Sequence, residues 1–352
     1  MTVHDPMIAS GREAIPDDAA MLRAAADLAR EYAAANPAIY WPDMLASALI
    51  GYAALAGAIA AQSVALAAAC GAVAMLAFYR AASFIHELTH IRKGALPGFL
   101  LGWNLIVGIP LMIPSFLYED VHTQHHARTR YGTAHDPEYL PLALMKPWSL
   151  PLFILLAALA PLGLILRFGL LTPLSFIVPP LRRKVVAEMS ALSINPAYRR
   201  REPQGEFRRR WLWQEAATSA FVLALVGSVF LLGWKPLLVY MAVHSAMTVI
   251  NQLRTLVAHL WENEGEAMTV TAQYLDSVNV PPPSPLAAIW APVGLRYHAL
   301  HHLLPSVPYH ALGKAHARLM ATLGEESPYR RGNYGGMLPL VGKIARSTMG
   351  QR

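Results

Sequence analysis

The chain has 352 residues, of which 55% are hydrophobic and 14% are charged, and its mean hydropathy is +0.34. Soluble domains carry about a quarter charged residues, so this composition excludes an ordinary water-soluble protein and indicates a membrane protein. The single cysteine, Cys70, excludes a disulfide within the chain and a Cys-x-x-Cys site for zinc or an iron–sulfur cluster. We therefore expect membrane lipids and no nucleic acid as partners, and any redox partner to be a separate molecule.

The N-terminal residues 1–43 are predicted to form a cytosolic arm with an alanine-rich surface helix over 17–34. The following stretch, 44–79, has no charged side chain. As one helix it would extend roughly 54 Å, well beyond a hydrocarbon core of about 30 Å. We therefore predict a hairpin of two transmembrane helices, Met44–Ala61 and Val64–Ile85, turning at Gln62 and Ser63.

A second transmembrane hairpin is predicted from Ala216–Leu232 and Leu237–Leu253, with Gly233-Trp234-Lys235-Pro236 as its turn. Two further apolar stretches, 96–117 and 150–178, lie between the hairpins. Glycine and proline break both, and Arg167 interrupts the second, so we predict re-entrant or interfacial segments.

These elements predict an all-α integral membrane protein. Its core is four transmembrane helices in two hairpins, joined by re-entrant or interfacial helices and covered by a cytosolic histidine-rich cap. We expect the membrane domain to span 44–320 and a C-terminal tail to occupy 321–352.

A basic loop over 181–210 has nine basic and three acidic residues, a surplus of six out of the net charge of +7. By the positive-inside rule this loop is cytoplasmic. Each hairpin returns to its starting side, so the histidine clusters described next share that side if neither broken stretch crosses the membrane singly. The general expectation for such a loop is orientation and contact with anionic lipid head groups, and docking of an acidic electron carrier is an alternative that the sequence does not exclude.

Eight histidines fall in three clusters with offsets of three and four residues, which bring side chains to one side of a helical turn. Neutral imidazole binds iron, zinc, copper and nickel, and eight ligands exceed what one tetrahedral ion uses. The pattern therefore predicts a site for two metal ions. The clusters are His86 and His90; His122, His125 and His126; and His298, His301 and His302.

The first cluster, His86-Glu87-Leu88-Thr89-His90, also fits the zinc peptidase signature His-Glu-x-x-His, in which the glutamate is the general base. A membrane zinc peptidase is therefore a remote alternative. It would have no use for two further His-x-x-His-His groups. In a two-metal site, Glu87 is instead expected to accept a ring N–H and fix a tautomer.

The order of these boxes, with membrane hairpins before the first and last, resembles the integral-membrane fatty acid desaturase and hydroxylase superfamily. The run from His301 to His310, His-His-Leu-Leu-Pro-Ser-Val-Pro-Tyr-His, is especially similar to the desaturase third box. The resemblance covers about Phe84 to Leu319. It implies a non-haem di-iron centre that activates O2 as co-substrate and removes hydrogen from an unactivated acyl chain, with electrons delivered from outside.

The resemblance also implies a ninth ligand, His259, at the end of the helix before the third box. Stearoyl-type desaturases carry an asparagine four residues earlier, where this chain has Thr255, so the resemblance does not extend to a water-bridged contact there. Asp136 and Glu138 are candidates to orient the second-box rings, with helix capping or a surface ion pair as alternatives. His135 is expected at the surface or beside the second box, and His244 as a hydrogen-bonded core residue.

We predict an O2-dependent desaturase of long acyl chains with its active site on the cytoplasmic side. Hydroxylation and oxidative decarboxylation to terminal alkenes are alternatives, because the three reactions share their early steps and differ in how the chain is positioned. A non-catalytic protein that stores or senses metal is a further alternative. The electron donor is expected to be an external ferredoxin, cytochrome b5 or rubredoxin.

Overall fold

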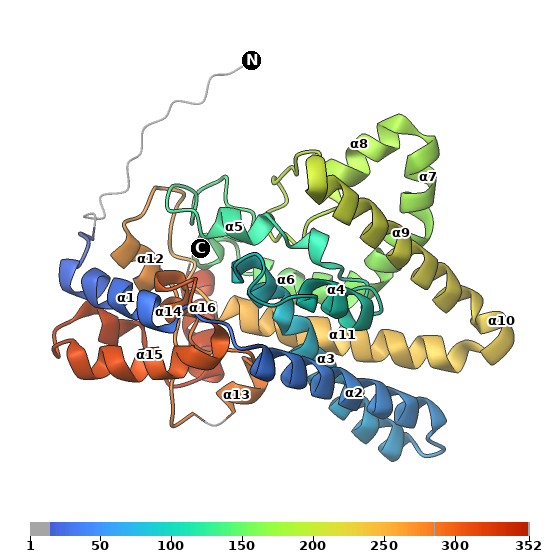
Figure 1. Cartoon of the computed structure of the whole chain (residues 1–352), viewed down its shortest axis with the longest axis horizontal. Helices are drawn as coiled ribbons and strands as arrows, with labels where there is room; N and C mark the ends of the chain where they lie inside the picture. Colours follow the sequence, from blue (N-terminus) through green and yellow to red (C-terminus); the bar gives the residue numbers. More distant parts are fainter. Residues whose placement is uncertain (1–14, 285, 351–352) are drawn as a thin grey trace.

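The computed structural model describes residues 15–284 and 286–350. Within these ranges the chain is helical and forms no strand, although three isolated backbone bridges join loops. In Figure 1, long helices extend to one side and shorter helices pack together at the opposite end. The all-α prediction is therefore confirmed. Residues 1–14 of the predicted arm lie outside the described residues.

The first predicted hairpin is present as α2 (Pro37–Ala60) and α3 (Val64–His90). The side chains of Asn36 and Ser63 cap these helices by accepting backbone N–H groups at 2.9 and 3.2 Å. The helices approach closely because Gly51 leaves space for the ring of Phe78. A Cβ atom at Gly51 would lie 2.5 Å from that ring. Both helices are long and apolar enough to cross a membrane.

The second predicted hairpin is formed by α9 (Gly205–Gly227) with α10 (Val229–Leu232), and by α11 (Trp234–Leu256). Gly205–Leu232 is long and apolar enough to cross a membrane. Helix α11, with 23 residues, is also long enough, although polar side chains lie along it, among them Lys235, His244 and Arg254. At the far tips of the hairpins, Lys235 donates to the carbonyl of Ala61 at 2.9 Å and joins the two.

The segment predicted as interfacial, 150–178, is not interrupted at Arg167 as expected. It forms one continuous helical stretch, Ser149–Ile177, which is long and apolar enough to cross a membrane. Its parts are α6 (Ser149–Leu166), η4 (Arg167–Leu171) and α7 (Thr172–Ile177). The helix continues through Arg167 because the guanidinium pairs with buried Glu215 of α9 at 2.7 Å. The earlier broken stretch forms only the short helices α4 (Phe99–Trp103) and η1 (Asn104–Gly108), which cannot cross a bilayer.

The remaining helices are shorter, and most of them gather at the histidine-bearing end. They are α1 (Ala19–Tyr32), η2 (Ser115–Leu117), α5 (Val121–His125), η3 (Leu142–Leu144), α8 (Pro179–Glu188), α12 (Val270–Asp276), α13 (Ala287–Trp290), α14 (His298–Leu303), α15 (Tyr309–Thr322), η5 (Pro328–Gly332) and α16 (Met337–Gly350).

Helix α1 occupies most of the predicted 17–34 helix and begins after an Asp18 N-cap. Met21, Ala25 and Leu28 are buried in a cluster shared with α15, so α1 is packed onto the cap. At the other terminus, α16 packs on η3, and the Thr348 hydroxyl donates to the Leu142 carbonyl at 2.9 Å. Both ends of the described chain thus support the cap.

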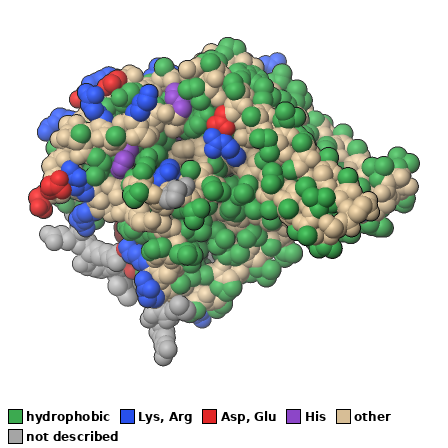
Figure 2. All heavy atoms as spheres, turned by 90° about the horizontal axis from the view of Figure 1, so that it is seen from below, with side chains coloured by type: hydrophobic (Ala, Val, Ile, Leu, Met, Phe, Trp, Pro, Cys, Tyr) green, Lys and Arg blue, Asp and Glu red, His purple; other side chains and the backbone are tan. Residues whose placement is uncertain are grey.

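The surface divides in the way a membrane protein requires. In Figure 2 hydrophobic side chains cover much of the visible face toward the hairpin tips, while charged side chains gather at the opposite end. Leucines on α2 and α6 illustrate the apolar part, with Leu49 70% and Leu162 60% exposed. Such exposure is costly in water and favourable in lipid. The chain is therefore an integral membrane protein, as the composition predicts.

Candidate metal centre

Four separate elements supply the histidines predicted from the sequence. The C-terminal end of α3, which is predicted to face the cytoplasm, carries the first box. Helix α5 and its C-terminal cap carry the second box, and α14 carries the third. His259 follows α11 and is fixed by an isolated backbone bridge to Ser277. Because α5 and α14 are each only five or six residues long, they present their rings as single helical turns.

The structure brings all nine predicted histidines together in two groups. Within each group the candidate ligand atoms all lie within 4.8 Å of one another. The five-histidine group is His86, His90, His122, His126 and His301. The four-histidine group is His125, His259, His298 and His302.

Several Nε2 atoms face one another directly. In the five-histidine group His126 lies 3.0 Å from His122 and 3.2 Å from His301. In the four-histidine group His298 lies 3.0 Å from His259 and 3.2 Å from His302. The rings themselves are buried or half-buried.

Hydrogen bonds behind three rings determine which nitrogen faces the centre. The Nδ1 atom of His122 lies 2.9 Å from a Glu138 oxygen, and that of His125 lies 2.9 Å from an Asp136 oxygen. A carboxylate accepts only, so each Nδ1 carries the proton and each Nε2 presents a lone pair to its group. The Nδ1 atom of His259 lies 2.8 Å from the Tyr131 hydroxyl.

Burial keeps most of these rings neutral. It lowers the pKa of His126, His301 and His302 well below the ordinary value, and neighbouring histidines lower it further. At His125, burial also acts to lower the pKa, but the charge and hydrogen bond of Asp136 outweigh it and raise the pKa. Burial raises the pKa of Glu138 to about 7.

The donor set fits metal ions. Both ring nitrogens of His86, and Nδ1 of His298 and His301, are buried without a hydrogen-bond partner among the described residues. An unpaired buried donor or acceptor costs about 1–3 kcal/mol. Lone pairs aimed at one another repel unless a cation lies between them. Nitrogen ligands grouped this way suit two transition-metal ions.

The comparison with known protein families shows which family has this arrangement of histidines. The profile of the fatty acid desaturase family matches residues 61–333, which include all nine histidines. The chain belongs to the fatty acid desaturase family. The resemblance predicted from the histidine boxes is therefore confirmed, and the protein is an oxidoreductase of the membrane di-iron type.

One relative is similar to this desaturase-family chain over nearly its whole length. It is a ceramide hydroxylase of Caulobacter vibrioides, 48% identical over 332 residues, which cover 94% of both chains. No solved structure matches the chain significantly.

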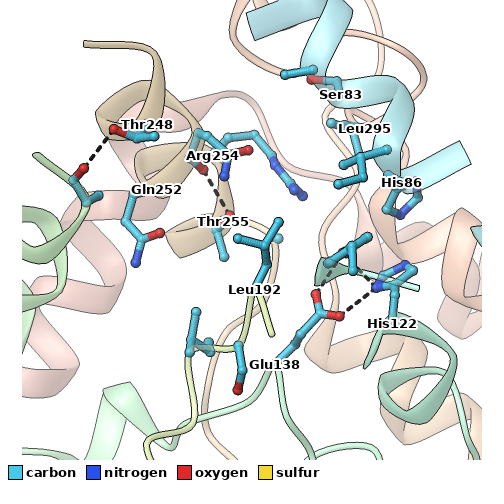
Figure 3. Close-up of a pocket in the computed structure, with 18 of the residues that line it drawn as sticks. Ser83, His86, His122, Glu138, Leu192, Thr248, Gln252, Arg254, Thr255 and Leu295 are labelled. Carbon is cyan, nitrogen blue, oxygen red and sulfur yellow. Dashed lines mark hydrogen bonds and ion pairs between the residues drawn. The ribbon is translucent and has the colours of Figure 1, made fainter. Parts of the chain in front are cut away.

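In this desaturase-family enzyme a cavity of about 390 Å³ borders both histidine groups. Figure 3 shows part of its wall, with His86 on α3, His122 and Glu138 beside the second box, and Arg254 on α11. Apolar side chains line much of the remainder, including Phe153, Leu192 and Met247. Its wall includes Leu156 on α6, which is 60% exposed, and exposed Asn251 on α11, so the cavity lies close to the surface at this pair of helices.

Glu87 does not take the predicted position behind a ligand ring. It accepts hydrogen bonds from the Tyr40 hydroxyl and, at 3.0 Å, from the backbone N–H of Tyr309, while the nearest ring nitrogen, Nδ1 of His86, is 3.8 Å away. Glu87 thus ties α2 and α3 to the start of α15. Asp136 and Glu138, for which capping was an alternative, do lie behind second-box rings.

The other histidines of the described ranges lie outside both groups. His135 is exposed, which matches one of its two expected placements. His244 is buried, as expected, but neither ring nitrogen has a hydrogen-bond partner among the described residues, which differs from the prediction. His316 is bonded to the Tyr329 hydroxyl at 2.8 Å, and His310 accepts the backbone N–H of Asn36 at 3.3 Å.

Three residues behind the rings were missed by sequence reasoning. Tyr131 bonds His259 and also donates to Asp276 at 2.8 Å, and burial raises the pKa of Asp276 to about 6. Tyr118 donates to Glu138 at 2.8 Å. Only Tyr118 has a signal in the sequence, because it precedes His122 by four residues and so falls on the same helical face.

Proposed function

We propose that the protein is an O2-dependent lipid hydroxylase that acts on ceramide or a closely related N-acyl lipid. The observation that carries this proposal is the 48% identity with a ceramide hydroxylase over 94% of both chains. It favours the hydroxylation alternative over our leading prediction of desaturation. In the proposed reaction a C–H bond, O2, two electrons and two protons give a C–OH group and one water molecule.

We further propose that the nine histidines hold two iron ions, one in the five-histidine group and one in the four-histidine group. The close lone pairs and unpaired buried nitrogens support occupancy by cations. Iron supplies the redox chemistry that O2 activation requires, which zinc does not. Asp136 and Glu138 are proposed to fix the rings of His125 and His122 and so increase their basicity as ligands.

The substrate chain is proposed to occupy the cavity beside the histidines. Its apolar wall suits methylene groups, and we place its opening between α6 and α11, where Leu156 and Asn251 are exposed. A methylene held beside both histidine groups would be oxidised, because proximity and orientation select the bond that reacts.

The site is proposed to face the cytoplasm and to receive electrons from an external ferredoxin, cytochrome b5 or rubredoxin. The basic loop supports this side, because Arg200 and Arg210 bond Glu119, just before the second box. The loop and the histidines therefore share one end of the molecule, so Ser149–Ile177, although long enough to cross a membrane, is proposed not to separate them. The positive-inside rule assigns this end to the cytoplasm.

Product analysis tests the proposed reaction. The purified protein, reconstituted with ceramide, isotopically labelled O2 and a reducing system, should yield ceramide that has gained one labelled oxygen atom. Metal analysis of the same preparation should find iron. Substitution of alanine for His298, a member of the four-histidine group, should abolish product formation and leave membrane insertion intact.

Desaturation is the second candidate, because the matching family profile is that of fatty acid desaturases. Mass spectrometry separates the two reactions, since a desaturase product has lost two hydrogen atoms and gained no oxygen. Such a product would overturn the hydroxylase proposal. Zinc in place of iron, with no lipid product, would overturn the di-iron proposal as well.

A further inference from the structure

A buried arginine in the cavity wall forms no ion pair at contact distance among the described residues, although its charge acts on the Glu138 carboxylate in the same wall. Arg254, near the C-terminal end of α11, is only 9% exposed, and its Nε atom has no hydrogen-bond partner among the described residues. The guanidinium contacts the hydroxyl of Tyr79, which itself donates to the carbonyl of Trp290 at 2.8 Å. No described carboxylate lies within ion-pair distance of it. Burial of an unpaired charge is costly, so a retained one points to a ligand.

The side chain of Arg254 extends into the cavity toward the histidines. Figure 3 shows it reaching from α11 toward the side that carries His86. Its positive charge acts on the four-histidine group. Burial is the main cause of the lowered pKa of His259 and His298, and the charge of Arg254 lowers both pKa values further. A group bound by Arg254 would therefore lie close to the reacting part of a substrate.

Other polar groups of the wall present acceptors. Four hydroxyls of the cavity wall each donate to a backbone carbonyl, at 2.6–2.9 Å, which leaves their oxygen lone pairs available. They belong to Ser83, Ser193, Thr248 and Thr255. The wall thus offers one cationic donor, several acceptors that include the Glu138 carboxylate, and two side-chain amides, Asn251 and Gln252, that can donate and accept. A fatty acid carboxylate accepts hydrogen bonds only, whereas an amide with hydroxyl groups both accepts and donates, so the wall favours the amide.

We propose that Arg254 donates to the amide carbonyl oxygen of an N-acyl lipid and thereby determines which methylene lies beside the histidine groups. This inference rests on the proposed function, because it assigns the recognition of its substrate class. Arg254 is a positioning residue: the carbonyl is held at the guanidinium, and the carbon that reacts is a fixed number of bonds away.

Equilibrium binding without an electron donor tests the contact directly. The probes are a fluorescent N-acyl sphingosine and its thioamide analogue, in which sulfur, a poor acceptor, replaces the carbonyl oxygen. Full-length wild type and Arg254→Gln, both in lipid nanodiscs, are titrated with each probe. Loss of a charged hydrogen bond should weaken amide binding by about 10- to 100-fold in Arg254→Gln. Arg254→Lys, which keeps the charge, should lose less.

The expected result is that the side chain of Arg254 matters for binding only when the probe has a carbonyl oxygen. Wild type should prefer the amide over the thioamide, and Arg254→Gln should bind both alike. Arg318→Gln removes the same charge from an exposed position on α15 and should bind as wild type does. Unchanged metal content and thermal stability would show that the variants are folded. Equal losses for amide and thioamide in Arg254→Gln, or no loss of either, would overturn the proposal.

Turnover provides the second readout. With a reducing system, Arg254→Gln should give a mixture of hydroxylation positions where wild type gives one. Wild type that binds the amide selectively but forms no hydroxylated product would refute the proposed function and leave the Arg254 contact standing. Normal hydroxylation at one position by Arg254→Gln would refute the contact and leave the function standing.

Discussion

At the residue scale, each histidine ring is positioned by what lies behind it as much as by its own helix. His301 and His302 are adjacent in sequence but belong to different groups. Substitution of either by alanine should therefore remove a ligand from a different ion. We expect each variant to lose turnover and to bind less metal per protein, as measured by elemental analysis. His135→Ala, at an exposed position near the second box, should retain both. Full metal content in either His301→Ala or His302→Ala would contradict the ligand assignment.

Asp136 permits a second prediction at this scale. Its oxygens bond the ring of His125 at 2.9 Å and the backbone N–H groups of Gly132 and Glu138 at 2.8 and 2.9 Å. Asp136→Asn keeps the shape but removes the charge, so metal affinity or activity should fall by about 10- to 100-fold. Competition with a chelator measures the affinity. Glu266→Gln, which neutralises an exposed carboxylate, is the control and should change neither.

At the element scale, the spacing of the histidines predicted which residues would meet but not how they would divide. In the second box, residues four apart, His122 and His126, share a group, and His125 between them joins the other. The third box repeats this division with His298 and His302 together and His301 apart. Offsets of three and four both lie on one helical side, so sequence alone could not separate them. The separation requires the arrangement of four elements in space.

The helix through Arg167 is an element that sequence reasoning misjudged. The apolar run was correctly located. The charge partner of Arg167, however, is Glu215, 48 residues away, and no local sequence pattern indicates such a pair. Glu215 is fully buried and also pairs with Arg182 of α8 at 2.8 Å. Asp276 and Tyr131, 145 residues apart, were missed for the same reason.

Removal of Glu215 should be strongly destabilising. Glu215→Gln leaves Arg167 buried without a charge partner, which typically costs about 3–5 kcal/mol. Thermal unfolding in detergent should show a markedly lower transition temperature. The matched substitution Glu206→Gln lies on the same helix, where the side chain is 65% exposed and paired with exposed Lys93. That pair should contribute about 0–1 kcal/mol, and equal effects of the two substitutions would contradict a structural role for the buried pair.

At the scale of the whole molecule, the orientation in the membrane can be tested by labelling. In a Cys70→Ala background, we would place a single cysteine in the basic loop (Arg183→Cys) or at the tip of the first hairpin (Gln62→Cys), both exposed positions. A thiol reagent that cannot cross membranes should label Gln62→Cys in intact cells and Arg183→Cys only after lysis. The reverse pattern would place the histidines on the outer side and refute the cytoplasmic assignment.

The proposed opening between α6 and α11 would determine how this enzyme encounters its substrate. A lipid that enters from the side never passes through water, so the concentration that the enzyme encounters is the concentration of substrate within the plane of the membrane. Its rate then depends on the mole fraction of substrate in the surrounding leaflet, and adding inert phospholipid slows turnover even when the total amount of substrate is constant. Saturation is accordingly a property of leaflet composition, and crowding by other lipids acts as competition.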